Sequence, residues 1–133
     1  MSRHEQGQRA ADEVVDWEHV GALRRMCARS RDRDRWPELV GMFLQDAHER
    51  AGALGEAVDA GDSELACELA HSLKGSSATF GAPVLLRLST VLEQLAREGD
   101  MHGASDLVRV LTLECDRVES ALAPTATARK RED

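Results

Sequence analysis

His71 has the neighbours that could make a histidine chemically active. Lys74, Gly75 and Ala78 follow it by three, four and seven residues, spacings that place all four residues on one side of a helix. A neutral imidazole is a nucleophile near pH 7. A lysine one turn away favours that neutral form and attracts anionic groups. The spacing therefore predicts a histidine that can accept a phosphoryl group, with Lys74 giving electrostatic assistance.

The apolar residues of the same segment predict that His71 faces solvent. The expected core face of this helix consists of Leu65, Leu69, Leu73, Ser76 and Phe80. At about 100° per residue, His71 projects about 160° from the centre of that face. Cys67 and Ala78 fall on the same outer side, with Gly75 at its edge. Because small side chains leave the surface beside the imidazole low, we predict that Cys67, Gly75 and Ala78 form a docking surface for a partner.

Three further long segments with helical periodicity are expected to support this helix. The four helices are predicted from about Pro37 to Asp59, from the N-cap Asp62 to Phe80, from Pro83 to Glu98 and from Met101 to Leu122. A shorter helix, from Asp16 to about Ala28, precedes them. The very short turns between the long helices favour an all-α fold, an antiparallel up-down-up-down four-helix bundle with a short additional N-terminal helix. The expected domain spans residues 14–123, with a disordered N-terminus at 1–13 and a disordered C-terminal tail at 124–133.

Composition and charge exclude several classes of function. The chain has 133 residues, of which 3% are aromatic, and a formal net charge of −7, so it is a poor candidate for binding nucleic acid. It has no apolar run long enough for a membrane span or a signal peptide, and we expect a cytoplasmic protein. Its three cysteines form neither a CxxC pair nor a zinc-type cluster with histidine, so no metal site is expected. The other four histidines lack neighbours like those of His71.

The segment from Ala70 to Ser77, followed by Phe80, Gly81 and Ala82, closely resembles the histidine-containing phosphotransfer (HPt) family of two-component phosphorelays. The resemblance extends from about Asp16 to Leu122. It implies that His71 accepts a phosphoryl group from a phospho-Asp receiver domain and passes it to another receiver. It also implies that Lys74 assists and that Gly75 keeps the docking surface open. The protein would then be a stoichiometric phosphocarrier and not an enzyme.

The same resemblance implies response-regulator receiver domains as partners, including those of hybrid sensor histidine kinases. It implies no cofactor for this chain, since Mg²⁺ would belong to the receiver's acidic pocket. We expect a monomer. Met1 and the short chain favour a free-standing carrier, with a fragment of a larger protein as the alternative.

Two other functions remain as alternatives. The first is a helical docking adaptor that binds receiver domains without phosphotransfer. The second is the dimerisation module of a histidine kinase, which is disfavoured because Ser72, and not an acidic residue, follows His71. The chain also lacks a Gly-rich nucleotide motif.

Overall fold

A computed structural model describes residues 13–29 and 34–127 of the chain. Within these ranges there are five helices and no strand: α2 (Trp17–Ala28), α3 (Trp36–Asp59), α4 (Ser63–Phe80), α5 (Pro83–Glu98) and α6 (Met101–Thr127). The prediction of an all-α protein is confirmed.

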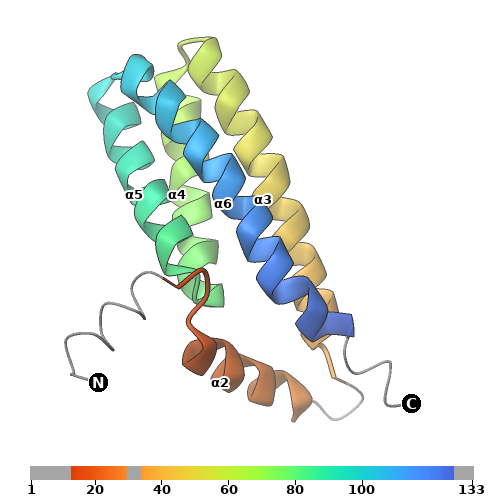
Figure 1. The fold of residues 1–133 in the computed structure, drawn as a ribbon. Helices are drawn as coiled ribbons and strands as arrows, with labels where there is room; N and C mark the ends of the chain where they lie inside the picture. Colours follow the sequence, from red (N-terminus) through yellow and green to blue (C-terminus); the bar gives the residue numbers. More distant parts are fainter. Residues whose placement is uncertain (1–12, 30–33, 128–133) are drawn as a thin grey trace, which may run out of the picture.

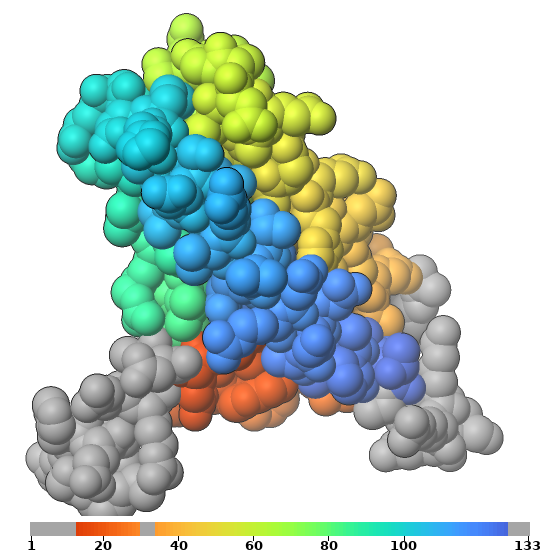
Figure 2. Space-filling view, turned by 45° about the horizontal axis from the view of Figure 1, so that its top comes forward, coloured from red at the N-terminus to blue at the C-terminus, as the bar shows by residue number. Residues whose placement is uncertain are grey.

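The four long helices form an antiparallel bundle in which each helix packs against the helices that precede and follow it (Figure 1). The most extensive contacts join α4 to α5 and α3 to α6. Helix α2 lies across one end of the bundle, where it contacts α3 and α4. Figure 2 shows the face that α6 crosses, with α3 beside it and α2 at its lower end. The predicted up-down-up-down bundle with an additional N-terminal helix is therefore confirmed.

Side-chain caps and glycines set the helix ends near the predicted positions. The Asp16 carboxylate accepts hydrogen bonds from the first turn of α2, and the Asp62 carboxylate accepts one from the first turn of α4. Gly81 ends α4 at φ 67° and Gly99 ends α5 at φ 78°. A positive φ costs glycine little because it has no Cβ, so the chain can reverse here within a few residues.

The buried face of α4 differs from the predicted one. Its members are Ala66, Ala70, Leu73, Ser77 and Phe80, whereas Leu65 is exposed and Leu69 and Ser76 are half-buried. The helix is thus rotated by about 60° from the expected orientation. Small side chains let α4 approach α5 closely, and the bulkier leucines then lie at the edge of the contact. His71 still points outward, at about 140° from the centre of the buried face.

The predicted C-terminal boundary is wrong, because α6 continues to Thr127 and includes Pro124. Residues 124–127 are therefore helical and not part of a disordered tail. The Thr125 hydroxyl accepts a hydrogen bond of 3.0 Å from Trp36 Nε1, and Trp36 is fully buried. This contact ties the last turn of α6 to the start of α3. Residues 1–12 and 128–133, which were also predicted to be disordered, lie outside the described ranges.

Candidate functional site

His71 lies on the outer side of α4, where 68% of its side chain is exposed. The Ala70 and Leu73 side chains beside it are fully buried and fix the rotation of the helix. The side chain of His71 therefore projects from a helix whose backbone is held by the core. This position agrees with the outward orientation predicted from the sequence.

Glu93 on α5 joins His71 to the neighbouring helix, and its side chain is only 6% exposed. Its Oε2 atom accepts a hydrogen bond of 2.7 Å from His71 Nδ1. Its Oε1 atom accepts one of 2.6 Å from Lys74 Nζ. Arg97, one turn further along α5, donates to Oε2 at 3.2 Å. Three donors thus surround one buried carboxylate, as buried charges require.

The hydrogen bond from Lys74 is the main cause that holds the pKa of Glu93 below its ordinary value. Burial acts in the opposite direction, and the hydrogen bond from His71 lowers the pKa further. Glu93 is consequently a carboxylate at neutral pH, with no proton to donate.

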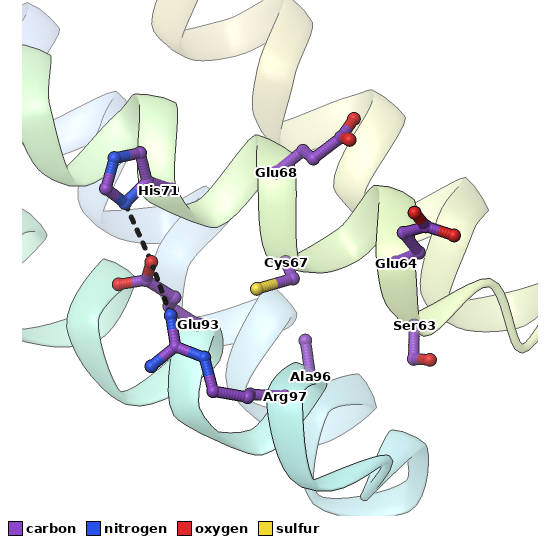
Figure 3. A pocket seen from close by; sticks show the side chains of 8 residues that line it. All are labelled: Ser63, Glu64, Cys67, Glu68, His71, Glu93, Ala96 and Arg97. Carbon is purple, nitrogen blue, oxygen red and sulfur yellow. Dashed lines mark hydrogen bonds and ion pairs between the residues drawn. The ribbon is translucent and has the colours of Figure 1, made fainter.

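An ionised Glu93 determines which nitrogen of His71 carries hydrogen. A carboxylate only accepts hydrogen bonds, so Nδ1 must be the donor, and in the neutral ring the lone pair is then on Nε2. Figure 3 shows the second ring nitrogen of His71 pointing away from Glu93. The geometry therefore presents Nε2 outward as a nucleophile.

A groove of about 570 Å³ lies beside His71, between α4 and α5. Half-buried Cys67 and buried Ala96 contribute to its wall, together with His71, Glu93 and Arg97 (Figure 3). Two further lining residues, Glu64 and Glu68, are exposed and acidic. Of the predicted docking residues, this groove includes Cys67.

The other two predicted docking residues, Gly75 and Ala78, are exposed and do not line this groove. Gly75 would have no atom within 4 Å of an added Cβ. Ala78 borders a second hollow, of about 180 Å³, between α4 and the start of α2. The structure thus places Cys67 beside the groove, one turn before His71, and Gly75 and Ala78 after it on the same helix.

Two aspects of the site were not predicted from its residues. Lys74 is bonded to Glu93, and no hydrogen bond joins it directly to His71. Glu93 itself was not expected to contribute. The spacing within its own helix does not reveal it, because Glu93 is buried by the packing of α5 against α4.

Among the described residues, no group of three potential metal-ligating side chains includes His71. None of the helices in the described ranges has both the length and the apolar character that a membrane span requires.

Comparison with known proteins extends this description. The family model for the Hpt domain matches residues 38–121. A similar solved structure is that of histidine-containing phosphotransfer protein B from Pseudomonas aeruginosa PAO1. It is 27% identical in sequence, with a TM-score of 0.81, over 88% of this chain and 97% of that one. No curated protein matches the sequence. The match over residues 38–121, which include α4 and α5, shows that this chain belongs to the Hpt domain family.

Proposed function

We propose that this protein carries a phosphoryl group on Nε2 of His71 between receiver domains of a two-component phosphorelay. Membership of the Hpt domain family supports histidine phosphotransfer in two-component signalling, with receiver domains as partners. The observation that supports Nε2 as the phosphorylated atom is the 2.7 Å hydrogen bond from His71 Nδ1 to buried Glu93.

The transfer needs no base on this chain. The Nε2 lone pair attacks the phosphorus of an aspartyl phosphate, the P–N bond forms, and the P–O bond to the receiver's aspartate breaks to release its carboxylate. No proton leaves Nε2, because in this tautomer it carries none. The ring becomes positively charged, and Glu93 stabilises that charge through Nδ1–H. Attack by a second receiver's aspartate on the phosphohistidine reverses these steps.

Lys74 has a second role in this scheme. Its side chain is 34% exposed while its ammonium group bonds Glu93. An ammonium group has three donors, so Lys74 can keep Glu93 as a partner and offer another hydrogen bond to the transferred phosphoryl oxygens. Lys74 would thus stabilise both the buried carboxylate and the developing charge of the phosphate.

The protein is a stoichiometric carrier: each molecule is phosphorylated once on His71 and loses that phosphoryl group to a second receiver before it can accept another. We propose that it acts as a monomer and that phosphotransfer uses no cofactor held by this chain, since Mg²⁺ is supplied by the acidic pocket of the receiver. The chemistry is reversible, so the free energies of the two aspartyl phosphates determine the direction of flow.

The first test is phosphorylation by a phosphorylated receiver domain. Wild-type protein should acquire phosphate that is labile in acid and stable in base, as expected for phosphohistidine, and His71→Gln should acquire none. Labelling of His71→Gln would overturn the assignment. Wild-type protein that binds the receiver but never acquires label would instead support the docking adaptor.

Gly75→Gln tests whether a receiver docks over this part of α4. An added Cβ at Gly75 would meet no atom within 4 Å in the free protein, so the fold should tolerate the substitution. Transfer should slow by at least about tenfold through lost docking alone, equivalent to about 1.4 kcal/mol. The matched control is Gly52→Gln, at an exposed glycine of α3 with equally open surroundings. Equal transfer rates for the two variants would place the docking surface elsewhere.

A further inference from the structure

A second cluster of potential ligands lies on the opposite side of the bundle from His71. His48 on α3 faces Asp116 and Glu119 on α6, and one ligand atom from each lies within 4.8 Å of the other two. His48 Nε2 is 3.0 Å from Glu119 Oε1, and His48 Nδ1 is 3.9 Å from Asp116 Oδ1. Because α3 and α6 pack along each other (Figures 1 and 2), the two halves of the cluster are held face to face.

The charges of this cluster are not balanced by the residues that the structure describes. Two carboxylates carry two negative charges, and one imidazole compensates for at most one of them. Arg117, the neighbour of Asp116, pairs with Glu114 instead, and Arg50 on α3 pairs with Asp46. In residues 13–29 and 34–127, no lysine or arginine forms an ion pair with Asp116 or Glu119. Among the described residues, the cluster therefore retains negative charge beside a nitrogen ligand.

We propose that His48, Asp116 and Glu119 bind a divalent transition-metal ion, with Zn²⁺ as the best fit. One imidazole nitrogen and two carboxylate oxygens provide three ligands, and water completes a tetrahedron. With metal–ligand bonds of about 2.0 Å, the ligand atoms of a tetrahedral site lie about 3.3 Å apart. At present the two carboxylates face different ring nitrogens of His48, with Glu119 at Nε2 and Asp116 at Nδ1. One ligand atom from each residue nevertheless lies within 4.8 Å of the other two, and Asp116 and Glu119 are exposed enough to change rotamer and meet at one nitrogen. An imidazole ligand favours Zn²⁺ over Mg²⁺.

Such a metal ion would join α3 to α6 without touching the face that bears His71. Asp116 and Glu119 are three residues apart on one helix, so a metal bound to these two alone would not join the helices. His48 adds the link to α3. Because the unfolded chain does not hold the three ligands together, the bound ion should stabilise the folded protein.

The test is titration of the full chain with Zn²⁺ and, separately, Mg²⁺, followed by calorimetry and thermal unfolding. Zn²⁺ should bind with one-to-one stoichiometry at this site and raise Tm, and Mg²⁺ should bind more weakly. Loss of outer-shell partners typically weakens metal binding 10–100-fold, so His48→Gln, which removes a direct ligand, should weaken it by at least about tenfold. The double variant Asp116→Asn with Glu119→Gln should do the same.

Two matched controls are His102→Gln, at an exposed histidine of α6 outside the cluster, and His71→Gln. Both should bind Zn²⁺ as the wild type does. Paramagnetic Co²⁺ should broaden the amide NMR signals around residue 48 and residues 116–119 first. Equal affinity of wild type and His48→Gln, or broadening centred on His71, would overturn the proposal.

Discussion

The hydrogen bond to Glu93 gives the two ring nitrogens of His71 different roles: Nδ1 donates to the carboxylate, and Nε2 keeps the lone pair. An exposed histidine without a partner exchanges between its two neutral tautomers, so either nitrogen can carry the lone pair. The 2.7 Å bond to Glu93 favours the tautomer in which Nε2 is the nucleophile. Burial strengthens this effect, because water competes little for a carboxylate that is 6% exposed. The second helix of the hairpin therefore contributes to the chemistry of the first.

Lys74 should affect both stability and phosphotransfer. Lys74→Ala removes the shortest hydrogen bond to a buried carboxylate, and we expect it to lower the free energy of unfolding by about 1–2 kcal/mol. Transfer should also slow, because the phosphoryl oxygens lose a cation. Urea unfolding and single-turnover transfer would measure the two effects.

Arg97→Ala is the matched control for this variant. Arg97 bonds the same carboxylate at 3.2 Å, but its side chain is 61% exposed, so its removal should cost less than about 0.5 kcal/mol. Equal losses of stability in the two variants would contradict the special role given to Lys74.

At the level of helices, the two ends of α4 were easier to predict than its buried face, whereas the predicted end of α6 was wrong. These ends depend on local signals: the Asp62 carboxylate caps the start of α4, and Gly81 ends the helix at a positive φ. Both residue types can be recognised in the sequence. The rotation of α4 depends on how closely α5 approaches. The sequence pattern favoured Leu65 as core, but close packing buried Ala66 instead. The same tertiary effect brought Glu93 under His71, which the spacing within one helix cannot show.

Substitution of Gly41 and of Gly61 by alanine should have opposite effects on stability, because only Gly61 has a positive φ. An added Cβ would meet nothing within 4 Å at either position, but Gly61 has φ +72°. Gly41→Ala should therefore raise the free energy of unfolding by about 0.5–1 kcal/mol, because Gly41 is exposed within a helix. Gly61→Ala should lower it by about 1 kcal/mol, because a side chain is strained at that φ. Chemical denaturation of both variants would test this, and shifts of the same sign would refute it.

At the scale of the whole molecule, two buried carboxylates should give opposite contributions to stability as pH changes. Burial raises the pKa of Glu114, although Arg117 and Arg87 oppose that rise. The pKa of Glu93 is instead lowered, mainly by the hydrogen bond from Lys74. Between the unfolded-state pKa, about 4.3 for glutamate, and the raised folded value, the native state binds more protons at Glu114 than the unfolded chain. Ionised Glu114 therefore destabilises the fold as pH rises through this window. Glu93 stabilises it fully above the unfolded-state pKa and loses that effect as pH falls through its lower folded value.

Unfolding free energies measured from about pH 3 to neutral pH should separate the two groups. Glu114→Gln should become more stable relative to wild type as pH rises, because the variant has no charge to bury. Glu93→Gln should become less stable relative to wild type over the same rise, because the charge that Lys74 and His71 bind is gone. The unfolding free energy of each variant minus that of the wild type, plotted against pH, should therefore rise for Glu114→Gln and fall for Glu93→Gln. Near-UV circular dichroism should first show that both variants are folded at neutral pH. Parallel curves would mean that the surroundings of the two carboxylates do not control stability in acid.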